Sequence, residues 1–256
     1  MDELKKRNVH AVFLANNHAL DFGESECKST VKLFKDNGFR TLGAGSNVDE
    51  AEQPLLFSMG KRKLILFNAY WFRNTRHAIS RHYALGDNAG TACLSDAFFD
   101  KVSYYRKKYP GAFIILSPHW GTDFAQPLKV QKSLAEKCIR AGADMVLGHG
   151  AHIVSGQEWV DGKMVLYSIG NFVFNSNGTD FNKKDKLPYG YVAKLYIWPQ
   201  KTELRLYPVM VNNRISFWQP FPVTEEQAGE LTEAYAIGAE CVRKSEDGFY
   251  FVFELK

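Results

Sequence analysis

The chain has 256 residues and a mass of 29.1 kDa, and 45% of its residues are hydrophobic while 23% are charged. This composition is typical of a globular protein and excludes a disordered, collagen-like or coiled-coil chain. The formal net charge of +4 is small and spread along the chain, so nucleic acid is not an expected partner.

The sequence contains neither a disulfide framework nor an export or membrane segment. Its four cysteines are far apart and form no C-x-x-C pair, so we expect buried thiols. No run approaches the roughly 18 apolar residues of a membrane helix, and residues 1–6 lack a signal-peptide pattern. The chain as given is expected to be soluble, while its compartment, cytoplasm or cell surface, and its oligomeric state stay open.

Short apolar runs alternate with helical patterns over the first two thirds of the chain, which indicates repeated β-α units. The expected strands are 9–15, 62–69, 112–117 and 144–147. The expected helices are 25–37, with Gly38 at its C-terminal end, 96–109, and 126–141, with Pro127 in its first turn. Residues 43–47 are expected to form a turn in which Ser46 or Asn47 caps the next helix.

After Gly148 the pattern becomes antiparallel. Asp161-Gly162 is a two-residue hairpin signal between expected strands 153–160 and 164–169. Further strands are expected at 191–198, 203–211, 214–219 and 249–255, with a helix at 225–237 and a polar loop at 175–188. No linker divides the chain, so residues 1–256 are predicted to form a single α/β domain.

Three of the expected strands end in polar residues that include histidine. These residues are Asn16, Asn17, His18 and Asp21, then His119, and then His149 and His152. Ligands bind outside the carboxyl ends of strands in an open α/β sheet, so we expect the four histidines to line one crevice. A single such histidine is commonly only a hydrogen-bonding residue, but the threefold recurrence favours a site. His10, His77 and His82 have no such setting and are expected on the surface.

Imidazole nitrogens combined with amide and carboxylate oxygens suit zinc, manganese or iron better than calcium. The sequence therefore predicts a hydrolase that uses one or two divalent metal ions. Nucleophilic catalysis by serine or cysteine and a nucleotide-binding glycine loop have no supporting motif.

Four segments resemble the successive motifs of the bacterial capsule-synthesis (CapA, poly-γ-glutamate biosynthesis) family. They are Ala15-Asn16-Asn17-His18-Ala19-Leu20-Asp21, Ser117-Pro118-His119-Trp120-Gly121, Gly148-His149-Gly150-Ala151-His152 and Tyr167-Ser168-Ile169-Gly170-Asn171-Phe172-Val173-Phe174. The resemblance covers about residues 9–211. It implies the fold of the calcineurin-like metallophosphoesterase superfamily, a sandwich of two mixed β-sheets flanked by helices around a metal centre.

The resemblance also implies roles for individual residues. His18, with Asp21 beside it, is the implied catalytic acid or transition-state stabiliser. The implied metal ligands are Asn17, His119, His149 and His152, although Gly-His-x-x-His replaces the family's Gly-His-His-Pro-His. Apart from the resemblance, we expect Asn16 and Asn171 to bind substrate, Asn171 because it would follow a strand end that faces the same crevice. Alternatively, residues 167–174 are a core strand with a glycine bulge.

This sequence departs from the family pattern at its front. The family begins with a strand ending in Gly-Asp and a following Asn-x-Glu segment, and neither is present here. Those carboxylates supply the first half of the metal site, so the N-terminal unit is expected to be missing and the site to be partial. A fragment, a chain completed by a partner, a one-metal variant and a non-catalytic site are all compatible with this pattern.

The segment 71–81 is basic, and Arg73 and Arg76 are expected to bind an anionic substrate by their forked guanidinium groups. The alternative is a solvated loop. Two functions follow: hydrolysis of a phosphoester or γ-glutamyl bond, or a non-catalytic role that binds polyglutamate or a capsule-synthesis partner subunit.

Overall fold

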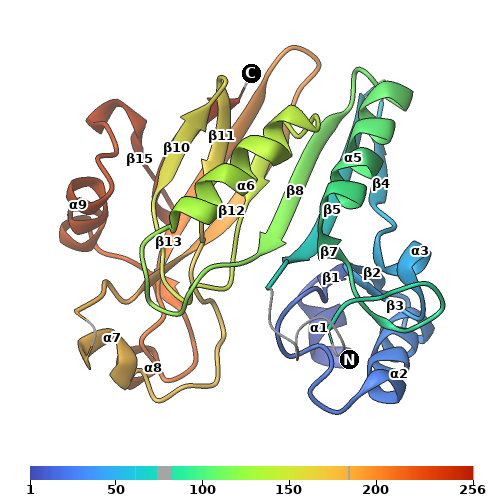
Figure 1. The fold of residues 1–256 in the computed structure, drawn as a ribbon. Coiled ribbons are helices and arrows are strands. Elements are labelled where there is room, and N and C mark those ends of the chain that lie inside the picture. The colour runs from blue at the N-terminus through green and yellow to red at the C-terminus, as the bar shows by residue number, and fades with distance from the viewer. Residues whose placement is uncertain (61, 74–81, 184, 256) are drawn as a thin grey trace. The chain divides into compact units, whose positions relative to one another are not determined.

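The computed structural model describes residues 1–60, 62–73, 82–183 and 185–255. Contacts divide the chain into two compact units. Unit 1 comprises Met1–Trp120 with Glu136–Val146, and unit 2 comprises Gly121–Ala135 with Leu147–Lys256. Each unit is built from strands flanked by helices, which confirms the predicted α/β class (Figure 1). The single domain stays a prediction.

Unit 1 contains the β-α part of the chain. Its elements are α1 (Asp2–Lys6), β1 (Ala11–Phe13), α2 (Glu24–Asp36), β2 (Arg40–Leu42), β3 (Ala44–Gly45), α3 (Val48–Ala51), β4 (Leu55–Met59), β5 (Arg62–Trp71), β6 (Gly90–Thr91), β7 (Cys93–Leu94), α5 (Asp96–Lys108) and β8 (Phe113–His119). Two further elements, α6 (Lys129–Arg140) and β9 (Met145–Leu147), begin in one unit and end in the other.

The sheet of unit 1 is mixed. Its strands follow the order β9-β8-β5-β4, in which β5, β8 and β9 are parallel, β4 is antiparallel, and β7 pairs with the end of β5. β8 is buried along almost its whole length, as expected of a central parallel strand. α5 lies beside β5 (Figure 1). The two elements pack through Phe67 of β5, whose ring lies 5.8 Å from Phe98 and 5.6 Å from Tyr105 of α5.

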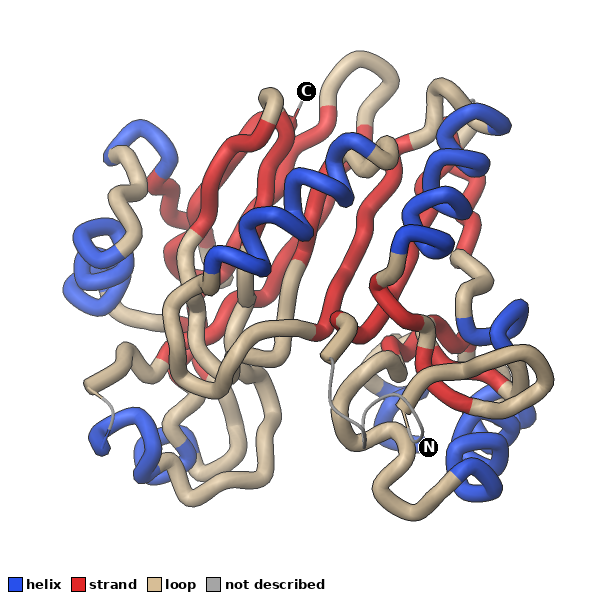
Figure 2. The backbone as a smooth tube through the Cα atoms, in the orientation of Figure 1, coloured by secondary structure: helices blue, strands red, loops and turns tan. Residues whose placement is uncertain are grey.

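Unit 2 is antiparallel. Its elements are β10 (Gln157–Val160), β11 (Lys163–Leu166), α7 (Thr179–Lys183), β12 (Tyr189–Ile197), β13 (Thr202–Met210), α8 (Asn213–Ser216), β14 (Phe221–Pro222), α9 (Glu225–Ala234), a 3-10 turn at Ala239–Cys241, β15 (Val242–Ser245) and β16 (Gly248–Leu255). One sheet has the order β12-β13-β16-β15, with β14 beside β13. The strands are drawn in red and the helices in blue in Figure 2.

Turn and cap residues explain where several predicted elements begin and end. The β10–β11 hairpin turns at Asp161 (φ 49°) and Gly162 (φ 73°), as the sequence predicts. Asn47 caps α3 by accepting the Glu50 N–H at 2.9 Å. Gly38 (φ 84°) follows the last residues of α2 in the left-handed conformation.

Three predictions of local structure are wrong. Residues 214–219 are not a strand, because the Asn212 side chain accepts the Arg214 N–H at 3.1 Å and starts α8, after which Phe217 and Trp218 take left-handed φ. Pro127 lies before α6 rather than in its first turn. Residues 175–188 include the short helix α7.

Candidate functional site

The loop after β1 holds His18 in a hydrogen-bonded turn. Asn16 Oδ1 accepts the His18 N–H at 2.8 Å, which is the local side-chain-to-backbone bond that asparagine makes in turns. His18 Nδ1 donates to Asp21 Oδ2 at 2.8 Å, and the Asn17 amide nitrogen donates to His18 Nε2 at 3.2 Å. The side chains of His18 and Asp21 are 70% and 46% exposed, so this pair is open to a substrate.

His119 is the last residue of β8, and in the parallel register it lies opposite Tyr70 of β5. The rings of His119 and Tyr70 are 5.7 Å apart. Two residues earlier on β5, Asn68 accepts the Ala15 N–H at 2.9 Å and donates to the Ser117 carbonyl at 2.7 Å. The structure therefore brings together the two strand ends of unit 1 that lead to His18 and to His119.

In unit 2, His152 is held on three sides. Its ring stacks on Phe124 at 5.8 Å and contacts Phe174 at 4.6 Å. Nδ1 of His152 donates to Asn171 Oδ1 at 2.9 Å, so the predicted ligand and the predicted substrate-binding amide are direct partners. The backbone of His152 has φ 63°, a strained value for a non-glycine residue that is commonly found at functional sites.

The Gly148-His149 segment lies at the end of β9. Gly148 donates its N–H to the Leu166 carbonyl at 2.8 Å and accepts the Ile169 N–H at 3.1 Å. Burial lowers the pKa of His149 to about 4, so its imidazole is neutral at physiological pH. Gly170 (φ 76°) lies so close to Tyr189 and Gly190 that a Cβ atom there would be 3.0 Å from the Tyr189 carbonyl oxygen.

Two of these histidines have the chemistry that a divalent metal ion requires. Metal-binding imidazole is neutral, as in His149, and its second nitrogen is commonly held by an oxygen atom, as in His152. Within the described part of the chain, no three His, Cys, Asp or Glu side chains lie close enough to hold one ion. The ligand set of Asn17, His119, His149 and His152 stays a prediction.

The predicted anion-binding segment is described only at its start. The Arg73 guanidinium lies 5.7 Å from the Trp71 ring centre. The backbone N–H of Arg73 donates to the Tyr83 hydroxyl at 3.0 Å. That hydroxyl donates in turn to the Trp71 carbonyl at 2.7 Å, and burial raises the pKa of Tyr83. Arg76 and His77 lie outside the described residues. His82, expected on the surface, is partly buried.

Sequence reasoning missed two polar residues of β5 that neighbour the site, Asn68 and Tyr70. The sequence did contain a signal for Asn68, because it is an amide inside the apolar run of residues 64–71. In the structure its side chain is buried, with 2% of the residue exposed. Phe124 and Phe174 were missed as neighbours of His152. Their sequence positions carry no periodic signal that places them beside an imidazole.

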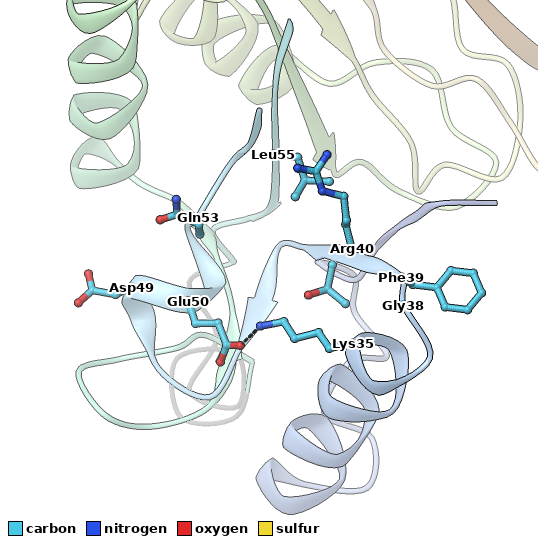
Figure 3. Close-up of a pocket in the computed structure, with 9 residues that line it drawn as sticks. Lys35, Gly38, Phe39, Arg40, Asp49, Glu50, Gln53 and Leu55 are labelled. Atoms are coloured by element: carbon cyan, nitrogen blue, oxygen red, sulfur yellow. Dashed lines mark hydrogen bonds and ion pairs between the residues drawn. The ribbon is translucent and has the colours of Figure 1, made fainter. Parts of the chain in front are cut away.

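Two pockets that are lined by described residues of unit 1 differ in character. One, of about 310 Å³, borders His18 and Asn16 and has Cys27 and Val31 among its lining residues. The other, of about 650 Å³, lies between α2, β2 and α3 and contains none of the predicted site residues (Figure 3). In the second pocket Lys35 and Glu50 point toward one another and form an ion pair.

Comparison with known proteins identifies a family and several relatives named for capsule or polymer synthesis. The model of the family described as "Bacterial capsule synthesis protein PGA_cap" matches residues 1–176. The capsule biosynthesis protein CapA of Bacillus anthracis is 26% identical over 180 residues, which are 69% of this chain and 43% of that protein. The PGA biosynthesis protein CapA of Bacillus subtilis is 27% identical over 179 residues, 69% of this chain and 45% of that protein.

A third relative comes from another genus. A probable polyglutamine synthesis accessory protein of Mycobacterium tuberculosis is 28% identical over 177 residues, 66% of this chain and 46% of that protein. The chain thus spans less than half of the length of each of these three relatives. No described helix has the length and apolar character needed to cross a membrane.

Proposed function

The chain belongs to the bacterial capsule synthesis (PGA_cap) family, whose model matches more than half of it, and from this premise we propose that it is a metal-dependent hydrolase of capsule or poly-γ-glutamate biosynthesis. The bond it cleaves is a phosphoester or a γ-glutamyl amide. Family membership supports the pathway, and the residues at the strand ends support the reaction class.

The observation that carries the proposal is the exposed pair of His18 and Asp21 on the loop after β1. Asp21 accepts the Nδ1 proton of His18 at 2.8 Å, which fixes the ring and directs Nε2 away from the carboxylate. A carboxylate in this position also stabilises the positive charge of the protonated ring. In this structure Nε2 accepts the Asn17 amide N–H at 3.2 Å. Once the ring is protonated and Asn17 has turned away, Nε2 is the nitrogen that would donate a proton to a leaving group.

The remaining residues are assigned to binding and orientation. The divalent metal ion (Mn, Zn or Fe) would be held in unit 2 by His149 and His152, while Asn17 and His119 of unit 1 stay predicted ligands. When bound, such an ion polarises the scissile group and lowers the pKa of a water molecule. Asn171 keeps Nδ1 of His152 occupied and so leaves Nε2 to face a ligand. Arg73 would bind the negative charge of the substrate.

The test measures turnover of four substrates in the presence of Mn²⁺, Zn²⁺ or Fe²⁺. The substrates are a phosphomonoester, a phosphodiester, a γ-glutamyl anilide and poly-γ-glutamate. We expect His18→Gln to lower kcat by about 10²–10⁴-fold on the preferred substrate, as for loss of a general acid. The matched control is His10→Gln, because His10 is exposed and its ring is hydrogen-bonded to Asn8, away from the His18 loop. Equal turnover in wild type and His18→Gln, or no turnover of any substrate, would overturn the proposal.

A second candidate function is binding of an anionic polymer without cleavage. The exposed Arg73 beside the Trp71 ring favours it, since such a cation can contact carboxylates without a metal. This function predicts poly-γ-glutamate binding that survives chelation and His119→Ala but weakens in Arg73→Ala. Binding that is lost on chelation and in His119→Ala would contradict it.

A further inference from the structure

We propose that Asn68 is a positioning residue that fixes the His18 loop and the His119 strand end in one arrangement. The inference rests on the proposed function for the roles of His18 and His119. The bridge itself is built from contacts inside unit 1 and needs neither metal nor substrate.

The side chain of Asn68 makes one bond to each of the two segments. Its Oδ1 accepts the N–H of Ala15, the residue that directly precedes Asn16-Asn17-His18, at 2.9 Å. Its Nδ2 donates to the carbonyl of Ser117, two residues before His119, at 2.7 Å. One amide group therefore joins segments that are about 100 residues apart along the chain.

The setting of Asn68 leaves the amide little freedom to move. Asn68 is 2% exposed, and its partners Ala15 and Ser117 are 1% and 2% exposed. Gly43 packs so closely that a Cβ atom there would lie 2.1 Å from Asn68 Oδ1 and 2.6 Å from the Ala15 Cβ. Buried in this way, the amide has no water to replace either bond.

The chemistry of the position selects an amide. A buried N–H and a buried C=O must be satisfied at once by one side chain, and a neutral amide offers both an acceptor and a donor. The parallel register of β5 and β8 places Asn68 opposite Ser117 and Tyr70 opposite His119. Residues two apart on a strand share a face, so Asn68 lies on the same face as Tyr70 and His119.

The experiment compares Asn68→Ala with wild type in the absence of metal and substrate. The readouts are the imidazole NMR resonances of His18, His119 and His10, together with amide hydrogen exchange at Ala15. We expect exchange at Ala15 to accelerate at least about tenfold, as for a buried amide that loses its acceptor. The resonances of both His18 and His119 should shift, while that of His10 stays in place.

The matched control is Ser103→Ala. It removes a partly buried hydrogen bond of unit 1, from Ser103 Oγ to the Ala141 carbonyl at 3.0 Å, which touches neither loop. It should leave the His18 and His119 resonances unchanged, so that general destabilisation is separated from loss of the bridge.

If Asn68→Ala does not fold, the same measurements are made on Asn68→Asp, because aspartate has nearly the same size as asparagine. Burial raises the pKa of such a carboxyl group. Below that pKa the protonated group accepts from Ala15 and donates to Ser117, and above it the ionised group repels the Ser117 carbonyl. We expect wild-type protection of Ala15 and wild-type His119 resonances only at the acidic end.

The inference would be overturned if the His18 and His119 resonances were unchanged in a folded Asn68→Ala variant. It would also be overturned if the differences between Asn68→Asp and wild type, in Ala15 protection and in His119 resonances, were the same at every pH. Failure of the proposed function looks different. In that case wild type shows no turnover, while both sets of resonances still respond to the change at Asn68.

Discussion

Four buried polar side chains lie close in sequence to candidate site residues. Asn68 and Ser117 precede Tyr70 and His119, and Ser155 and Ser168 flank the segments of His152 and Asn171. A buried polar group costs free energy unless it is hydrogen-bonded. The bonds that Asn68 makes therefore fix the backbone on which the functional side chains stand.

At the scale of one residue, Glu50 gives a prediction of pH-dependent stability. Burial raises its pKa, but hydrogen bonds from Lys35 and from the Ser46 backbone outweigh that effect and lower the pKa below its ordinary value. Glu50 then stabilises the fold above its unfolded-state pKa of about 4.3, and this stabilisation is lost as pH falls through the folded-state pKa. We expect Glu50→Gln to lower the free energy of unfolding by about 1 kcal/mol at pH 7.

Urea denaturation at pH 7 and at pH 3.5 checks this prediction. The difference between wild type and Glu50→Gln should shrink at the lower pH, which is closer to the lowered folded-state pKa of Glu50. Asp49→Asn is the control, because Asp49 lines the same pocket, points away from Lys35 (Figure 3) and forms no described ion pair. A difference that stays constant with pH would contradict the assignment.

At the scale of elements, the sequence predicts the limits of a helix or hairpin where the hydrophobic periodicity agrees with a capping or turn residue. α2 and α5 fall within one residue of their predicted limits, and the β10–β11 hairpin turns where Asp161-Gly162 predicts. It fails at residues 214–219, where Ile215, Phe217 and Trp218 favour a strand. There the capping side chain of Asn212 outweighs β propensity, and such tertiary and capping effects are not visible in periodicity.

The unforeseen helix α8 gives the second prediction. Asn213, 3% exposed, donates to the carbonyls of Phe174 at 2.7 Å and Ser176 at 2.6 Å, and so ties the loop after Asn171 to α8. We expect Asn213→Ala to lower the free energy of unfolding by about 2 kcal/mol, for two hydrogen bonds of about 1 kcal/mol each. Hydrogen exchange should also accelerate in residues 171–178, because Phe174 loses its anchor.

Thr224→Ala is the matched control for Asn213→Ala. Thr224 forms the capping box of α9 with Gln227, and its loss costs about 1 kcal/mol. Exchange in residues 171–178 should not respond to it. A loop that is equally protected in both variants would show that Asn213 does not anchor it.

At the scale of the whole molecule, the candidate site is predictable in part. Apolar runs in the sequence locate the ends of strands, and they predict that His18 and His119 follow the carboxyl ends of two strands. In the structure, the Asn68 side chain joins these two strand ends within unit 1. The partners that orient each histidine come from distant segments, as Phe124 and Phe174 do for His152. A single sequence contains no signal for such contacts, since they depend on packing between elements.

The last prediction concerns the response of the whole chain to metal ions. An ion that binds only the folded state at about 100 times its Kd adds about 2.7 kcal/mol to stability. For a chain of this length that corresponds to a rise in Tm of about 5–10 °C. We expect this rise in Tm with Mn²⁺, Zn²⁺ or Fe²⁺ in wild type and in His10→Ala, and a much smaller rise in His119→Ala and His152→Ala. Calorimetry measures the Tm, and elemental analysis measures the metal content of each protein. His10 is the control because it is exposed and bonded to Asn8. A wild-type Tm that does not respond to any of the three ions, with no metal retained on purification, would leave polymer binding by Arg73 as the function that the chain supports.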